Sequence, residues 1–305
     1  MYKSIANLSL LITIITLFGC STNYKSHSPA IQLTASPPNL KNMAVTEKPS
    51  NISSVAKKYI KKSKFLQEKS VKALAKTPIK QAFLKSSPQP IPILMYHSIG
   101  INRRNNLLVA PAKFASQIKH LHKAGYQSIC FNILENHWKL GKPLPPKPIL
   151  LTFDDGYKDN YTIAYPILKK YKFKATIFVI TNFVDDANHL SQKQIKEMIS
   201  SGLIDIGAHT KTHPDLTTVP SKKVYQEIFG SKQILTKYTG KPVIAFAYPI
   251  GRYNYEAVKA TGAARYKFAV TTKPGYANPK QGWLTLNRVR INGDLSLAAF
   301  TRMFP

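Results

Sequence analysis

Two kinds of hydrophobic pattern alternate along the C-terminal two thirds of the chain. Short runs in which nearly every residue is apolar are typical of strands buried on both faces. Longer segments place apolar residues three and four positions apart, as in helices that pack one face on a core. We predict strands over residues 91–96, 149–153, 175–180, 203–208, 243–247 and 268–271, with a further strand-like stretch over 126–129. We predict helices over residues 111–124, 161–171, 192–201, 221–238 and 255–262.

This alternation favours an α/β fold with a parallel sheet. About seven strands in roughly 215 residues fit a closed barrel better than a flat, doubly wound sheet. In a β/α barrel, functional groups lie on the loops that follow the strands. Polar or aromatic residues follow four of the predicted strands, namely His97, Asp154 with Asp155, His209, and Tyr248. We therefore expect these residues to gather around one mouth.

The residues at these strand ends predict a metal-dependent hydrolysis. Two adjacent carboxylates after a buried strand are costly unless one binds a cation or is paired. His209 and His213 are four positions apart, so a helical turn would place both imidazoles on one face. Together with Asp155 they form the three-ligand set of a catalytic Zn²⁺ or another divalent transition metal. Asp154 is then the candidate base, and His97 the candidate acid for a departing amine.

Each of these signals has a plainer explanation when taken alone. An Asp-Asp-Gly sequence is often a turn or a calcium-like loop, and a pair of histidines four positions apart is often a helix surface pair. His97 could be a buried histidine with an ordinary structural role. The two motifs together, each after a buried strand, favour the metal site.

Charge separates this chain from an ordinary globular protein. Its 305 residues carry 44 Lys and Arg against 14 Asp and Glu, a formal charge of +30. Such a field attracts polyanions: nucleic acid, anionic lipid or acidic envelope polymers. Six of the fourteen acids lie between Asp154 and Glu197, which makes the aspartate pair more informative. Two cysteines exclude a disulfide framework and a cysteine-based zinc site, and Cys130 is expected to be a small buried residue.

The N-terminus has the features of an export signal. Lys3 precedes an apolar stretch over residues 8–18 that is too short for a comfortable transmembrane span. It ends in Leu-Phe-Gly-Cys, which resembles a bacterial lipobox, although an ordinary secretory signal is the alternative. We predict a lipoprotein signal peptide over 1–19 and a lipid anchor on Cys20. The protein would lie in the cell envelope, on the periplasmic face of the outer membrane in a Gram-negative cell, where nucleic acid is not an expected partner.

Residues 20–89 are predicted to be a basic, disordered tether. They are rich in Ser, Pro, Asn and Lys, and contain thirteen lysines but only two acids. Low hydrophobicity with one-sided charge favours disorder. A solvated linker is the favoured interpretation, while residues 55–84 have some helical spacing and could bind an anionic envelope surface. The catalytic domain is predicted to follow over 90–305.

Three sequence motifs resemble those of a known family. Residues 152–156 (TFDDG), 209–213 (HTKTH) and 247–251 (AYPIG) resemble the first three motifs of the polysaccharide deacetylase (NodB-homology) family, carbohydrate esterase family 4. The resemblance covers about residues 90–295. It implies a distorted (β/α)7 barrel, a Zn²⁺ or similar ion, and removal of acetyl groups from N-acetylglucosamine polymers. By motif position it gives the aspartate pair and the two histidines the roles described above.

The chain departs from the usual family pattern at two places. The third motif usually carries an arginine that restrains the base, but Ala247 holds that position, so Arg288 or Arg290 is the candidate substitute. The late Leu-His motif that supplies the acid is missing before Pro305. A similar sequence, Ile-Leu-Met-Tyr-His, stands instead at residues 93–97.

This order resembles the circularly permuted arrangement of poly-β-1,6-N-acetylglucosamine deacetylases, which supports His97 as the acid and an N-acetylated glycan polymer as the partner. The resemblance also implies a backbone N–H near Ile250 as an oxyanion donor and Tyr248 as a residue that lines the site. A peptidoglycan or chitooligosaccharide deacetylase, an O-acetyl esterase, and a non-catalytic glycan-binding lipoprotein are the alternatives.

Overall fold

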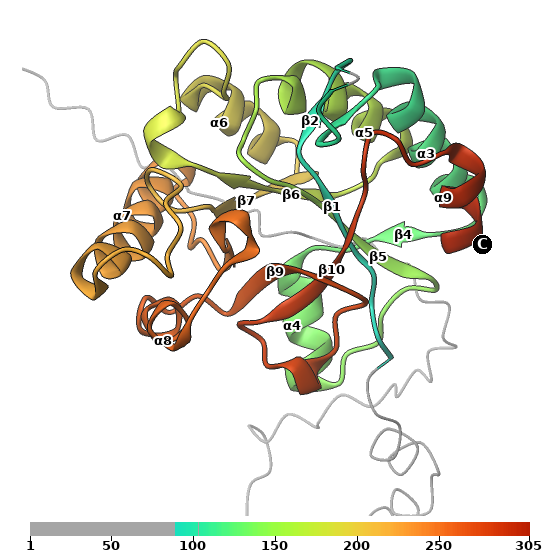
Figure 1. The fold of residues 1–305 in the computed structure, drawn as a ribbon. Coiled ribbons are helices and arrows are strands. Elements are labelled where there is room, and N and C mark those ends of the chain that lie inside the picture. Colours follow the sequence, from blue (N-terminus) through green and yellow to red (C-terminus); the bar gives the residue numbers. More distant parts are fainter. Residues whose placement is uncertain (1–88, 103) are drawn as a thin grey trace, which may run out of the picture. The chain divides into compact units, whose positions relative to one another are not determined.

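The computed structural model describes residues 89–102 and 104–305 (Figure 1). The predicted signal peptide, Cys20 and almost all of the predicted tether lie outside these residues.

Seven parallel strands close into a barrel, as the sequence predicts. Each strand pairs in parallel with the next, and the ring closes because β1 pairs with both β5 and β10 (Figure 1). The barrel strands are β1 (Ile93–Tyr96), β5 (Pro148–Phe153), β6 (Ala175–Val179), β7 (Ile204–Ala208), β8 (Ala245–Ala247), β9 (Phe268–Pro274) and β10 (Leu286–Arg290). β1 lies between the last strand and the strand of the aspartate pair, where a strand moved from the end of the chain to its start would lie.

One strand-like stretch lies outside this ring. β4 (Gln127–Ser128) pairs only with the first two residues of β5, whereas β6 pairs with its last two. The seventh barrel strand is β10, which the hydrophobic pattern does not reveal because it contains two arginines. A two-stranded ladder of β2 (Ser98–Ile99) and β3 (Leu108–Val109) follows β1.

Helices pack around the barrel, and the helix over residues 131–140 packs on its interior cluster, where Phe131 contacts Phe178 and Phe268. The helices are α3 (Pro111–Lys123), α4 (Phe131–Leu140), α5 (Tyr165–Tyr171), α6 (Gln192–Ser200), α7 (Ser221–Thr239), α8 (Tyr255–Ala263) and α9 (Leu297–Met303). The five predicted helices are present, while α4 and α9 were not predicted. A π-helix (Asn160–Ala164) stands where the predicted helix at 161 begins, and short 3₁₀ helices span Thr181–Phe183, Pro249–Gly251 and Pro279–Gln281. No helix in the described part of the chain is long and apolar enough to span a bilayer.

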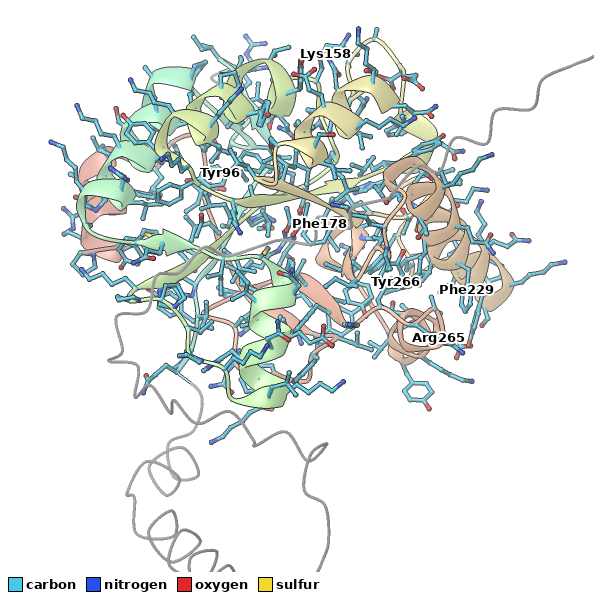
Figure 2. The ribbon with its side chains drawn as sticks, turned by 180° about the vertical axis from the view of Figure 1, so that it is seen from behind. Tyr96, Lys158, Phe178, Phe229, Arg265 and Tyr266 are labelled. Atoms are coloured by element: carbon cyan, nitrogen blue, oxygen red, sulfur yellow. The ribbon has the colours of Figure 1, made fainter. Side chains whose placement is uncertain are left out.

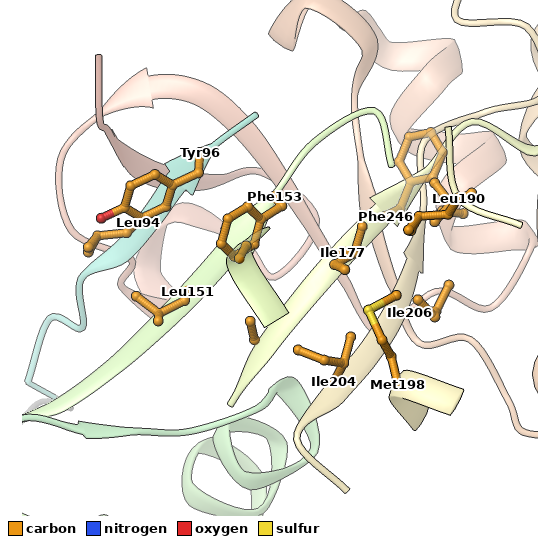
Figure 3. Close-up of a cluster of buried hydrophobic side chains, with 14 of the residues drawn as sticks. Leu94, Tyr96, Leu151, Phe153, Ile177, Leu190, Met198, Ile204, Ile206 and Phe246 are labelled. Atoms are coloured by element: carbon orange, nitrogen blue, oxygen red, sulfur yellow. The ribbon is translucent and has the colours of Figure 1, made fainter. Parts of the chain in front are cut away.

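The alternation of side chains along the strands divides the core in two. Outward residues such as Tyr96, Phe153 and Ile177 pack between the barrel and its helices (Figure 3). Inward residues form a second cluster inside the ring, where Phe178 lies near the centre (Figure 2). Gly207 makes room for this ring, because a methyl group there would lie 2.4 Å from Phe178. The strand period of two therefore decides which residues reach the barrel interior.

Candidate active site

The same alternation aims the candidate site residues into the barrel. Tyr96, Phe153 and Ala208 end their strands on the outward face, so the residue after each one points inward. Those next residues are His97, Asp154 and His209. The inward-facing Arg288 of β10 joins them and is fully buried.

Three side chains at this mouth form a candidate metal site. Asp155 Oδ1 lies 3.4 Å from His209 Nε2 and 3.7 Å from His213 Nε2, and all three ligand atoms lie within 4.8 Å of one another. Tetrahedral zinc ligands at 2.0–2.2 Å from the ion are roughly 3.4 Å apart. His209 Nδ1 donates to the Ala247 carbonyl at 2.7 Å, which leaves Nε2 with its lone pair toward the site. Donor chemistry and spacing therefore fit a divalent transition metal.

The two histidines do not share a helical turn, so that prediction is wrong. Residues 209–213 form a tight loop in which Thr210 (φ 65°) and His213 (φ 59°) are left-handed. The His213 N–H donates to Thr210 Oγ1 at 3.0 Å, and the Thr210 carbonyl accepts from the Thr181 N–H at 3.2 Å. A spacing of four fits both a helical turn and this loop, so spacing alone could not distinguish them.

Glu227 holds this loop and was missed by the sequence analysis. Its carboxylate accepts the N–H groups of Lys211 and Thr212 at 2.7 and 2.8 Å, and the Thr212 hydroxyl at 2.8 Å. Glu227 is fully buried on the apolar face of α7, and its only ion pair among the described residues is with Lys223. The sequence did offer a signal for Glu227. It is a carboxylate on the core face of a predicted helix, in a chain with few acids.

The candidate base Asp154 is held by Arg288 rather than Arg290. Two guanidinium nitrogens of Arg288 donate to the two carboxylate oxygens of Asp154, both at 2.7 Å. Two further N–H groups of Arg288 donate to the Thr271 carbonyl at 2.8 Å and to Thr152 Oγ1 at 3.1 Å. Burial alone would raise the pKa of Asp154, but the charge and hydrogen bonds of Arg288 hold this pKa well below its usual range. Asp154 is therefore an ionised carboxylate fixed in one orientation.

His97 faces Asp154 from the neighbouring strand end. Its Nε2 lies 3.8 Å from Asp154 Oδ2, and its side chain is 12% exposed. Burial lowers the pKa of His97, although the charges of Asp154 and Asp155 oppose this effect. An imidazole in this position can exchange a proton with a group bound at the mouth.

Backbone strain is concentrated around these residues. Eight non-glycine residues in the described ranges have positive φ, and four of them are Asp155 (74°), Thr210 (65°), His213 (59°) and Ile250 (59°). Left-handed backbone is unusual for a β-branched residue and is often found at functional sites. Among the described residues, the Ile250 N–H has no backbone acceptor outside its own 3₁₀ turn, and its side chain is 54% exposed.

Tyr248 does not line the mouth with its side chain, contrary to the prediction. Ala247 points into the barrel, so the next residue points outward. The Tyr248 ring is fully buried, stacks on Tyr253 at 4.9 Å, and its hydroxyl donates to the Leu284 carbonyl at 3.1 Å. Tyr248 is therefore part of the helix-facing core.

Known proteins resemble this chain in both sequence and fold. The family described as Polysaccharide deacetylase matches residues 141–269. YxkH of Bacillus subtilis, named as a polysaccharide deacetylase, is 38% identical over 235 residues, which cover 77% of this chain and 83% of that protein. The poly-β-1,6-N-acetyl-D-glucosamine N-deacetylase of Staphylococcus aureus (strain MRSA252) is 29% identical over 202 residues, 62% of this chain and 69% of that protein.

A solved structure extends the likeness to three dimensions. The Streptococcus pyogenes deacetylase PplD, in complex with acetate, superposes with a TM-score of 0.68 at 35% identity, covering 72% of this chain and all of that one. Sequence and fold therefore agree. This chain belongs to the polysaccharide deacetylase family and is a hydrolase that acts on carbon–nitrogen bonds.

Proposed function

We propose that this deacetylase removes N-acetyl groups from poly-β-1,6-N-acetylglucosamine in a metal-dependent reaction. The observation that carries the proposal is the position of His97 directly after the first strand, 3.8 Å from a carboxylate that Arg288 holds ionised. The Staphylococcus aureus relative, named for its action on this polymer, supports the choice of linkage.

The residues divide the reaction between them. Asp155, His209 and His213 would hold the ion, which when bound lowers the pKa of water and polarises the acetyl carbonyl. Asp154 accepts a proton from the attacking water, because its carboxylate is ionised and fixed by Arg288. His97 donates a proton to the nitrogen as the C–N bond breaks, which yields acetate and a free amine.

The backbone at Ile250 supplies a further interaction. Among the described residues its N–H has no backbone acceptor outside its own turn, and it would donate to the carbonyl oxygen as negative charge develops there. This role needs the backbone conformation and not the isoleucine side chain.

A non-catalytic glycan-binding role is less well supported. Its motive was the alanine at position 247, where the family usually carries the arginine that restrains the base. Arg288 forms a bidentate ion pair with Asp154 from another strand, so a restrained base is present.

A panel of acetylated glycans tests the substrate. Acetate and free amines would be measured with β-1,6-linked and β-1,4-linked N-acetylglucosamine oligomers, peptidoglycan and O-acetylated xylan. We expect the greatest release from the β-1,6 oligomers, loss of activity with a chelator, and recovery with Zn²⁺. Release only from peptidoglycan, β-1,4 oligomers or xylan would replace the proposed substrate, and no release from any of them by metal-loaded protein would refute the enzyme proposal.

We also propose that the protein works at the cell envelope, anchored through Cys20. The apolar stretch over 8–18 and the Leu-Phe-Gly-Cys sequence support this location. Replacing Cys20 with Ala should move the protein from the membrane fraction to the supernatant. An unchanged membrane fraction would contradict lipidation at this residue.

A further inference from the structure

The backbone of β1 loses its barrel partner immediately before His97. The pairing of β1 with β5 ends at Tyr96, whose carbonyl accepts the Asp154 N–H at 2.9 Å. Ser98 and Ile99 pair instead with β3, outside the barrel. His97 therefore lies between two ladders, and in the described structure no backbone N–H of either ladder donates to its carbonyl.

Two side chains from the segment after Asp155 form hydrogen bonds with the backbone at this point. Asn160 Nδ2 donates to the His97 carbonyl at 2.9 Å. Asp159 accepts the Ile99 N–H at 2.9 Å on one carboxylate oxygen and the Ser98 hydroxyl at 2.5 Å on the other. We call these two residues the Asp159–Asn160 clamp.

Two acceptors fix the orientation of the Asn160 amide, and this orientation leaves its oxygen unpaired, which costs stability. Its nitrogen donates both to the His97 carbonyl and to Asp159 Oδ1, at 2.9 and 3.0 Å. Asn160 is 1% exposed, and its amide oxygen has no partner among the described residues. Rotating the amide would place that oxygen against two acceptors. A buried, unpaired oxygen is retained because the nitrogen is needed where it is.

The backbone at the clamp is also unusual. A π-helix spans Asn160–Ala164, directly before α5, where the sequence predicts an ordinary helix. π-helical turns are rare and are often found at functional sites. Here the turn begins at a clamp residue, five residues after the candidate metal ligand Asp155.

We propose that Asp159 and Asn160 are positioning residues that hold His97 in place relative to Asp154 and the metal ligands. The inference rests on the proposed function, because it assigns His97 a proton to deliver. One short loop, 154–160, then carries the base, a metal ligand and the groups that hold the acid. The spacing between acid and base is then set by that loop together with the backbone hydrogen bond between Tyr96 and Asp154.

Kinetics of matched variants test the clamp. We expect Asn160→Ala and Asp159→Ala to lower kcat about 10- to 100-fold with KM nearly unchanged, since small displacements of a catalytic group have effects of this size. Asp159→Asn should retain most activity, because its amide oxygen can accept from Ile99 and its nitrogen can donate to Ser98. Metal content should stay at the wild-type level in all three.

Gln117 of α3 offers a matched control, because it contacts the same strand, β1, through Tyr96. It is a buried amide that accepts the Tyr96 hydroxyl at 3.1 Å, one residue before His97, and its amide nitrogen also has no partner in the described structure. Gln117→Ala therefore removes a comparable buried amide without touching the His97 peptide. We expect it to lower the melting temperature and leave kcat within about twofold.

A second readout does not depend on turnover. In zinc-loaded protein labelled with ¹⁵N-histidine, Asn160→Ala should shift or broaden the His97 ring signals and leave those of His209 and His213 unchanged, while Gln117→Ala should alter none. Unchanged His97 signals in Asn160→Ala, or equal losses of kcat in Asn160→Ala and Gln117→Ala, would overturn the clamp. If the wild-type enzyme released no acetate, the proposed function would fail, and the ring signals would still decide the clamp.

Discussion

The two ends of the barrel differ in the charges they carry. The mouth, at the C-terminal ends of the strands, holds Asp154, Asp155 and Asp159, which are all at least partly buried. The opposite end, where the chain enters the strands, is covered by exposed lysines, among them Lys123, Lys147, Lys169, Lys170, Lys172 and Lys241. Basic residues occur at both ends, since Figure 2 shows Lys158, from the loop after Asp155, and Arg265, which follows α8, far apart. The acids of the site lie at the mouth alone.

Left-handed backbone occurs at both ends for different reasons. At the opposite end, Lys172 and Arg265 adopt it where α5 and α8 end, as many helix termini do. At the mouth, Asp155 and His213 adopt it, and no helix ends there. At the mouth, the left-handed backbone orients two candidate metal ligands. The net charge of +30 does not identify the reaction at this site.

The largest effect should come from removing a metal ligand at the mouth. His209→Ala and Asp155→Ala each leave two of three ligands, so we expect bound zinc to be lost and acetate release to fall by at least about 10³-fold. Metal content by mass spectrometry of the purified proteins, with acetate release, checks both effects. Full zinc content in either variant would place the ion elsewhere.

The next effect should come from the restraint of the base. Arg288→Met leaves Asp154 buried without its partner, which should lower the free energy of unfolding by about 3–5 kcal/mol. The pKa of Asp154 should rise, because burial then acts without the opposing arginine. The acid limb of the pH–rate profile should therefore move to higher pH.

Arg288→Lys provides the control for charge alone. It keeps a positive charge but loses the two parallel hydrogen bonds, so we expect an intermediate shift of the acid limb. An acid limb at the wild-type pH in Arg288→Met would show that Asp154 is not the group that titrates.

A smaller effect should follow from relieving strain at Ile250. Glycine adopts φ 59° without steric cost, and the isoleucine side chain is largely exposed. Ile250→Gly should raise the free energy of unfolding by about 1 kcal/mol and retain activity, since the N–H is kept. Equilibrium denaturation and acetate release measure these quantities. A large loss of kcat with the fold intact would assign the role to the side chain instead.

The smallest effect should come from the opposite end. Replacing Lys169, Lys170 and Lys172 with Glu should leave kcat on a neutral oligomer within about twofold, because exposed charges beyond a Debye length of the mouth are screened. A tenfold change at moderate salt would show that the two ends are coupled.

The sequence predicted the barrel and the residues at its mouth because both depend on short-range pattern. Buried strands appear as apolar runs, and the residues that follow them gather wherever parallel strands end together. The predicted helical turn at His209 and His213 was wrong because the spacing of two residues does not determine the backbone angle φ. The predicted orientation of Tyr248 was wrong because a side chain's direction depends on which face of β8 lies inside the barrel. That is a property of the closed ring.

Partners from distant segments could not be found in this way. Glu227 and the Asp159–Asn160 clamp act through contacts with residues 15 to 63 positions away, and Arg288 could be named only as one of two candidates. Only the tertiary fold shows which carbonyl or carboxylate each of them meets. Arg288 and Arg290 lie two positions apart and share one face of β10, so alternation could not separate them. Arg288 is buried within the barrel, whereas Arg290 ends the strand and is exposed.

The most direct test compares wild-type protein with Asp154→Asn for zinc content and acetate release from a β-1,6 N-acetylglucosamine oligomer, measured on the same samples. Asparagine keeps the shape of the side chain and can still accept from Arg288, but it cannot take a proton from water. We expect equal zinc content and a loss of activity of at least about 10³-fold. Acetate release near the wild-type rate by zinc-loaded Asp154→Asn would contradict the assignment of Asp154 as the base.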